Sequence, residues 1–158
     1  TDHYDPRTNT IRLSDSVCDS YSISAVGVAA HEAGHAVQYA KGYFPIKLRS
    51  VILPVCNLGS QLSLPLLIIG LIFNFYFLVK LGVVFFCGAL LFQLVTLPVE
   101  FNASRRAVTA LKDGAVLLTD NDIKYAKKVL SAAAMTYVAA ALVSLAQLIR
   151  LIAITGKK

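Results

Sequence analysis

Three residues early in the chain have the types and spacing of a hydrolytic metal site. The stretch 29–37 reads Ala-Ala-His-Glu-Ala-Gly-His-Ala-Val, so His31 and His35 are four residues apart. On a helix this spacing puts both imidazoles on one face, where they can bind a single ion. Zinc suits such ligands, and a catalytic zinc takes three protein ligands plus a water molecule whose pKa it lowers. Glu32 would then act as general base, taking a proton from that water and passing it to the leaving amine.

The same spacing can also arise by chance, as a polar stripe or a buried pair on any helix. Here the flanking residues 24–30 and 36–40 are mostly small and apolar, which predicts a largely buried helix from about residue 22 to residue 41, ended by Gly42. Unpaired His and Glu side chains in a buried helix are costly. Gly34 would let another element approach the metal closely. The context therefore favours a metal site, with one Zn²⁺ per chain.

Long apolar stretches follow the predicted metal helix. Hydrophobic residues make up 56% of the 158 residues and charged residues only 15%, and Lys80 is the only charged residue between Arg49 and Glu100. About 20 apolar residues suffice for a helix to cross a bilayer. We predict membrane spans at about 51–79, 81–100 and 129–153, with a tight reversal at 80–82 between the first two.

The expected fold is a mainly α integral membrane protein, with a zincin-like metal helix, a short N-terminal strand and about three transmembrane helices. Alternating residues at 10–14 predict that strand, which suits either a substrate-binding edge or a simple surface hairpin. We expect one membrane-embedded domain, divided into 1–49 (strand and metal helix), 50–100 (two spans), 100–128 (third-ligand helix and cytoplasmic segment) and 129–153 (last span). Because the chain opens with Thr1, we also expect an upstream span or signal anchor that this sequence lacks.

The third metal ligand can be sought from the membrane topology. If the first span leaves the side of the metal helix, the second returns to it and brings Glu100 to the face that holds His31 and His35. Glu100 is the first acidic residue after the long apolar run, which favours it as the ligand over an interfacial carboxylate paired with Arg105 or Arg106. Asp113 is the alternative candidate for the third metal ligand.

The basic residues indicate orientation. The formal net charge of +6 comes from residues at the ends of apolar segments, with no alternating basic and aromatic run of the kind that binds nucleic acid. Most of them lie on the side of the metal helix, whereas Lys80, Lys157 and Lys158 lie on the other. The positive-inside rule then places the active site on the cytoplasmic side of the cell membrane and the carboxyl terminus outside.

Three longer motifs resemble a known family. They are Asp-His-Tyr-Asp-Pro-Arg at 2–7, the stretch 24–36 around the two histidines, and Pro-Val-Glu-Phe-Asn-Ala-Ser-Arg-Arg-Ala at 98–107. Together they resemble the YugP-like family of small bacterial membrane proteins, classed as neutral zinc metallopeptidases, over essentially the whole chain. The resemblance implies a zinc-dependent membrane peptidase with an additional amino-terminal span.

A wider similarity is to HtpX and Ste24-type membrane proteases, in which the third ligand begins a Glu-x-x-x-Asp pattern. Glu100 matches the Glu, but Ser104 stands where the Asp would be. That Asp orients a ligand histidine, so we expect Ser104 or Asn102 to replace it as a weaker hydrogen-bond partner. Site-2-type intramembrane proteases instead take an Asp from an Asp-Gly context, which Asp113 and Gly114 offer.

The leading hypothesis is a membrane-bound zinc endopeptidase that acts on membrane-associated or misfolded polypeptides, with the lipid bilayer but no nucleic acid as a partner. A hydrogen-bond donor that would stabilise the transition state cannot be assigned, but His3, Tyr4 and Arg105 have suitable side chains. The alternatives are a zinc-binding membrane scaffold without hydrolytic activity and a site-2-type protease that uses Asp113. A metal transporter is disfavoured because the metal helix precedes the spans.

Overall fold

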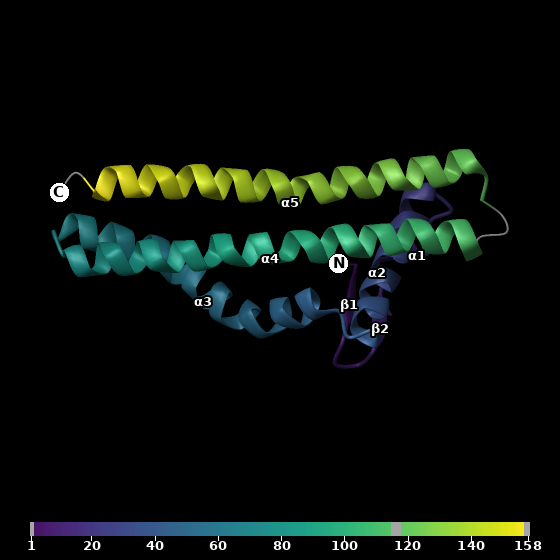
Figure 1. The fold of residues 1–158 in the computed structure, drawn as a ribbon, viewed down its shortest axis with the longest axis horizontal. Helices are drawn as coiled ribbons and strands as arrows, with labels where there is room; N and C mark the ends of the chain where they lie inside the picture. The colour runs from purple at the N-terminus through teal and green to yellow at the C-terminus, as the bar shows by residue number, and fades with distance from the viewer. Residues whose placement is uncertain (1, 115–117, 157–158) are drawn as a thin grey trace. The chain divides into compact units, whose positions relative to one another are not determined.

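The computed structural model describes residues 2–114 and 118–156, and it is predominantly helical (Figure 1). An antiparallel hairpin comes first, formed by β1 (His3–Asp5) and β2 (Thr10–Arg12), and it is followed by the one-turn helix α1 (Asp15–Cys18). Four longer helices complete the chain: α2 (Ile23–Ala40), α3 (Phe44–Ile72), α4 (Tyr76–Gly114) and α5 (Asp120–Thr155). The predicted class, a mainly α protein with a short N-terminal strand and three long apolar helices, is confirmed.

The chain forms two compact units. The first comprises Thr1–Lys47 and Leu97–Thr136, and it holds the hairpin, α1, α2, the end of α4 and the start of α5. The second comprises Leu48–Thr96 and Tyr137–Lys158, and it holds most of α3, the start of α4 and the end of α5. Both predicted histidines and Glu100 therefore belong to the first unit.

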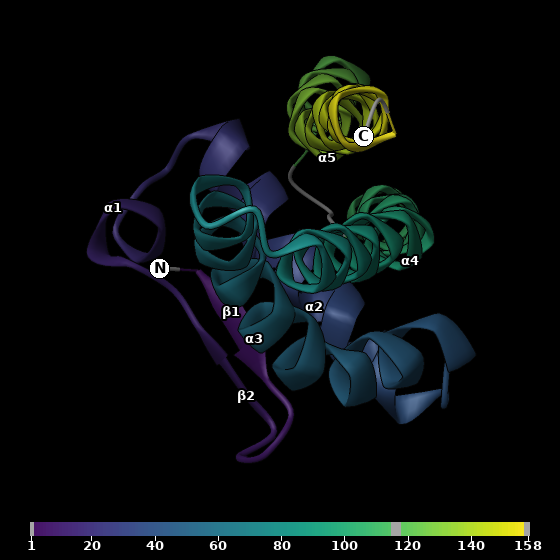
Figure 2. The same cartoon turned by 90° about the vertical axis from the view of Figure 1, so that its left-hand side faces the viewer.

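Helix α2 has well-defined ends that the sequence predicted to within a residue. At its start the Ser22 side chain accepts a hydrogen bond from the backbone N–H of Ala25 at 3.2 Å, which caps one of the unpaired donors of the first turn. At its end Gly42 takes a left-handed φ of 64°. The backbone N–H of Tyr43 then donates to the Gln38 carbonyl at 2.9 Å, as in a Schellman motif. The hairpin lies beside α2 (Figure 2), with the rings of Tyr4 and Tyr39 5.5 Å apart.

Helices α2 and α4 approach each other very closely at one glycine. A Cβ added to Gly34 would lie 2.6 Å from the backbone oxygen of Ala103, a distance that real Cβ atoms do not tolerate. Val99, Ala103 and Ala107 are fully buried on α4. A Cβ added to Gly27, two turns before Gly34 on α2, would lie 3.7 Å from the side chain of Ala126 on α5, an ordinary packing distance. Small residues thus bring the helix backbones of the first unit together.

We expect Gly34→Ala to destabilise the first unit by about 1–3 kcal/mol, the usual cost of overpacking a tight core, because the new methyl group would meet helix backbone. Thermal unfolding in detergent would measure this. Gly88→Ala on α4 is a matched control, since an added Cβ there has nothing within 4 Å and alanine favours the helix. A Gly34→Ala variant that is as stable as Gly88→Ala would contradict the proposed close packing.

The predicted reversal at 80–82 is wrong, because the chain turns earlier, at 73–75. Asn74 adopts a left-handed φ of 54°, and the backbone N–H of Phe75 donates to the Gly70 carbonyl at 2.8 Å, which ends α3 as Gly42 ends α2. Gly82 instead lies inside α4, where its missing Cβ makes room for Leu67 and its carbonyl accepts from the Ser63 hydroxyl at 2.9 Å. Gly82 therefore allows close helix packing and does not form a turn.

Three helices, α3, α4 and α5, are long and apolar enough to cross a membrane, with mean hydropathies of 1.8, 2.2 and 2.0 in their most apolar windows. Helices α4 and α5 extend beyond the spans predicted at 81–100 and 129–153, because their polar ends continue as helix. Helix α3 begins before the span predicted at 51–79 but ends at Ile72, so that prediction is too long at its C-terminal end. Many large apolar side chains on them are exposed, such as Phe77, Val84 and Leu142. Such side chains fit contact with lipid.

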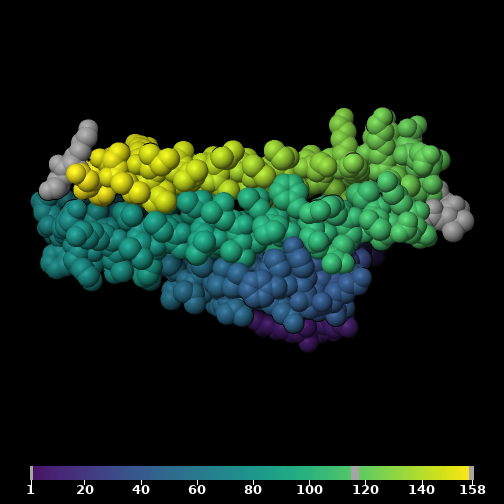
Figure 3. Space-filling view, viewed as in Figure 1, coloured from purple at the N-terminus to yellow at the C-terminus, as the bar shows by residue number. Residues whose placement is uncertain are grey.

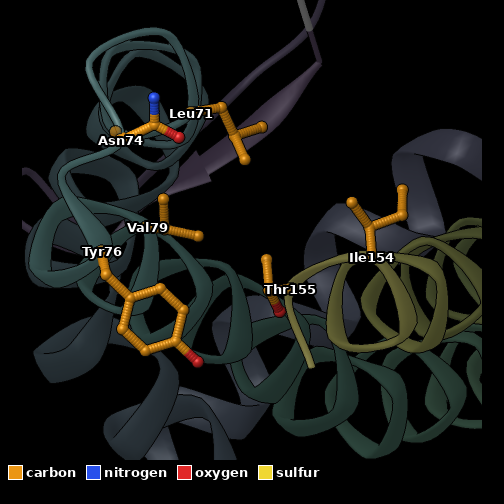
Figure 4. A pocket seen from close by; sticks show the side chains of 7 residues that line it. Leu71, Asn74, Tyr76, Val79, Ile154 and Thr155 are labelled. Atoms are coloured by element: carbon orange, nitrogen blue, oxygen red, sulfur yellow. The ribbon is translucent and has the colours of Figure 1, made fainter. Parts of the chain in front are cut away.

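In the second unit the end of α5 lies along the start of α4 (Figure 3). A cavity of about 230 Å³ lies there, lined by Gly70, Leu71, Asn74, Tyr76, Val79, Ile154 and Thr155 (Figure 4). No histidine, cysteine or acidic residue lines this cavity, so it offers no metal ligands. The chemistry-bearing residues gather in the first unit instead.

Candidate metal centre

Two helices bring the predicted ligands together. His31 and His35 lie one turn apart on α2, and Glu100 lies on α4. One ligand atom from each of the three lies within 4.8 Å of the others, and among the described residues this is the one such group of three or more. Glu100 Oε2 is 3.1 Å from His31 Nε2 and 3.7 Å from His35 Nε2. Asp113, the rival, is exposed at the end of α4 and does not belong to this group.

Each imidazole is held at its other nitrogen. The Ser104 hydroxyl lies 3.2 Å from His31 Nδ1, and the Gln38 side-chain oxygen lies 3.0 Å from His35 Nδ1. Both Nε2 atoms therefore face the same Glu100 oxygen. Metal-ligating histidines in proteins commonly make such a hydrogen bond at the second nitrogen, because it fixes the orientation of the ring.

The geometry fits zinc. Nitrogen and oxygen atoms bound at about 2.0–2.1 Å to a tetrahedral zinc lie roughly 3.3 Å apart, and the two histidine–Glu100 distances of 3.1 and 3.7 Å bracket that spacing. Two imidazoles and one carboxylate are also a usual donor set for catalytic zinc. The residues present thus suit the ion that the sequence predicts.

The centre is buried and electrostatically coupled. Glu100 is 3% exposed, and Glu32 and His35 are each 8% exposed. Burial lowers the pKa of His35, but the nearby Glu100 carboxylate, with Gln38 and Glu32, outweighs burial and leaves this pKa above its ordinary value. Glu32 therefore lies within electrostatic range of the centre without belonging to the three-residue group.

The other predicted residues lie around this centre in different ways. Ser104 contacts His31, as expected, whereas Asn102 accepts hydrogen bonds from Gln38 at 3.0 Å and from Arg106 at 2.8 Å. The Tyr4 hydroxyl donates to Asn9 in the hairpin. Arg105 lines a separate pocket between α4 and α5 in the first unit.

Sequence reasoning missed Gln38. It is a fully buried polar residue three positions after His35, so both lie on one face of α2. An amide in a stretch of small apolar residues was the available signal. Its distant partners, Val99 and Asn102, were not visible in the local sequence.

The chain combines three apolar helices with a group of two histidines and a carboxylate, in which His35 and Glu100 are buried and His31 is partly exposed. These features suit a membrane protein with a metal site. Comparison with known proteins gives the family. The family described as "Putative neutral zinc metallopeptidase" matches residues 1–156, and the chain belongs to this family.

A curated relative supports this assignment. The "Putative membrane protease YugP" of Bacillus subtilis (strain 168) is 47% identical over 154 residues, which are 98% of this chain and 68% of the relative. No solved structure matches the chain significantly. With its three apolar helices, the chain is a membrane protein of a zinc metallopeptidase family.

Proposed function

We propose that the protein is a membrane-bound endopeptidase that uses one zinc ion per chain to hydrolyse peptide bonds. The observation that carries this proposal is the largely buried group in which His31 and His35 direct Nε2 toward the Glu100 carboxylate. The chain's membership of a zinc metallopeptidase family supports the choice of zinc as the metal and of peptide hydrolysis as the reaction.

In the proposed mechanism His31, His35 and Glu100 hold the metal. When bound, zinc supplies the Lewis acidity that activates a water molecule and polarises the peptide carbonyl. The Glu32 carboxylate accepts the proton of that water and then donates it to the leaving amine. Glu32 suits this role because it is buried beside His35 yet is not needed as a ligand. Ser104 and Gln38 keep the imidazole rings in place.

The substrate class we propose is polypeptide that is associated with the membrane or misfolded near it. The support is the location of the candidate centre in a chain whose long helices expose apolar side chains. Such an enzyme would meet substrates at the bilayer surface. The charge pattern, with basic residues at the ends of apolar helices, favours membrane orientation over nucleic-acid binding.

Chelation tests the proposed reaction. Detergent-solubilised protein should cleave unfolded casein, lose this activity when a chelator removes the metal, and regain it with about one equivalent of zinc. Elemental analysis of the same samples measures the zinc content. Cleavage that persists in protein shown to contain no zinc would refute zinc-dependent hydrolysis.

We also propose that the centre faces the cytoplasm, since basic residues gather on the side of α2. Lys41 precedes α3 and Phe73 follows it, and both are exposed. In a background with the three native cysteines replaced by alanine, we expect Phe73→Cys to react with an impermeant thiol reagent in intact cells. Lys41→Cys should react only after the cells are permeabilised. The reverse labelling pattern would place the centre outside.

A further inference from the structure

The Gln38 side chain has three polar partners and no access to solvent. It is 0% exposed. Its oxygen lies 3.0 Å from His35 Nδ1, and its nitrogen donates to the Val99 carbonyl at 2.8 Å and to Asn102 Oδ1 at 3.0 Å. The oxygen and nitrogen of a glutamine side chain can be exchanged by a 180° flip. When both atoms are buried and hydrogen-bonded, only one of the two orientations satisfies all the partners.

Its partners determine which orientation that is. The Val99 carbonyl can only accept a hydrogen bond, so the Gln38 nitrogen must face it. Asn102 Oδ1 also accepts a hydrogen bond from Arg106 Nε at 2.8 Å, and this nitrogen can only donate. The Asn102 atom that faces Gln38 is therefore an oxygen, which again requires the Gln38 nitrogen opposite it. Both amide hydrogens of Gln38 are thereby used, and its oxygen is left to His35.

This orientation has a consequence for His35. A side-chain oxygen of glutamine can only accept, so His35 Nδ1 must carry the proton. A neutral imidazole with a proton on Nδ1 has its free electron pair on Nε2, the atom that faces Glu100. At 3.7 Å the Glu100 oxygen is too far from His35 Nε2 to compete through a hydrogen bond.

We propose that Gln38 is a positioning residue that holds His35 in the tautomer whose Nε2 is free to bind the metal. This inference rests on the proposed zinc site and adds to it the device that prepares one ligand. His31 differs, because its partner Ser104 has a hydroxyl that can donate or accept and so does not select a tautomer.

The chain has three histidines, so ¹⁵N-labelled histidine gives few ring signals, whose shifts show which nitrogen is protonated. In metal-free wild-type protein, at a pH high enough that the ring shifts of His35 show a neutral imidazole, we expect His35 to carry its proton on Nδ1. This measurement requires neither a variant nor a bound metal. A proton on Nε2 of neutral His35 would overturn the proposal.

Two substitutions separate this role from simple packing. Gln38→Met keeps the volume but removes the acceptor, so His35 should populate both tautomers and zinc should bind roughly 10- to 100-fold more weakly in a chelator competition. Gln38→Glu keeps an acceptor but loses the hydrogen bonds to Val99 and Asn102, so it should retain the Nδ1 proton and bind zinc more tightly than Gln38→Met. Packing alone predicts the opposite order, because methionine suits a buried site better than a carboxylate.

Gln61→Met, at an exposed position of α3, is the matched control and should leave zinc affinity unchanged. A Gln38→Met protein with the wild-type tautomer and zinc affinity would overturn the proposal. If the wild-type protein binds no zinc, the proposed function fails, whereas the tautomer in the metal-free protein still decides the role of Gln38.

Discussion

Replacing Glu32 with glutamine is expected to reduce peptide hydrolysis at least about a hundredfold, the usual contribution of a positioned general base. Glutamine has nearly the same size and still forms hydrogen bonds, but it cannot accept the proton of the attacking water. Glu32 lies outside the group formed by His31, His35 and Glu100. Zinc content and thermal stability should therefore stay close to those of the wild type.

Casein cleavage by detergent-solubilised wild type and variant would measure the effect, with zinc content determined on the same samples. Asp113→Asn is a matched control, since it makes the same carboxylate-to-amide change at an exposed position on α4. Its activity should equal that of the wild type. Equal cleavage by wild type and Glu32→Gln, with zinc bound in both, would remove Glu32 from the mechanism. A zinc-loaded wild type that cleaves no substrate would favour the alternative hypothesis, a zinc-binding membrane scaffold without hydrolytic activity.

Glu100→Ala is expected to have the largest effect on metal binding. Glu100 is 3% exposed and its carboxylate faces both histidines, so alanine would leave two ligands and a cavity. Zinc affinity should fall by more than the roughly 10- to 100-fold that loss of an outer hydrogen-bond partner costs. Competition with a chelator of known affinity would measure it. Asp113→Ala should bind zinc as the wild type does.

The same pair of variants tests the alternative ligand assignment. If Asp113→Ala lost its zinc while Glu100→Ala kept it, the third ligand would be Asp113 and a site-2-type mechanism would replace the one proposed here. Circular dichroism of each variant is needed beside the metal measurement, because both changes fall on α4. Unchanged helicity with lost zinc identifies a ligand.

Local signals explain why the sequence predicted α2 so closely. Ser22 and Gly42 act within a few residues of themselves, through a side-chain cap and a left-handed φ. Glu100 was predicted by a non-local argument, namely that the second membrane span returns the chain to the side that holds the metal helix. The structure groups it with His31 and His35, and its role as a ligand stays a prediction.

The misplaced turn has a local cause, whereas the missed role of Gln38 does not. Lys80 and Gly82 predicted a turn because a charge and a glycine interrupt an apolar run, but Lys80 lies over the Tyr76 ring at 4.7 Å and continues the helix. Asn74, which makes the turn, is one polar residue in an apolar stretch and gives a weaker signal. The hydrogen bonds of Gln38 to Val99 and Asn102 cross 61 and 64 positions of sequence, beyond the reach of any local pattern.

The contact of Gly34 with Ala103 lies between the two histidines on one helix and between Glu100 and Ser104 on the other. Main chain meets main chain there, so the spacing of the ligand-bearing backbones depends on rigid covalent geometry and not on side chains that can change rotamer. If the proposed zinc site is right, little backbone entropy would remain to be lost when the ion binds, so more of the intrinsic bond strength would appear as affinity.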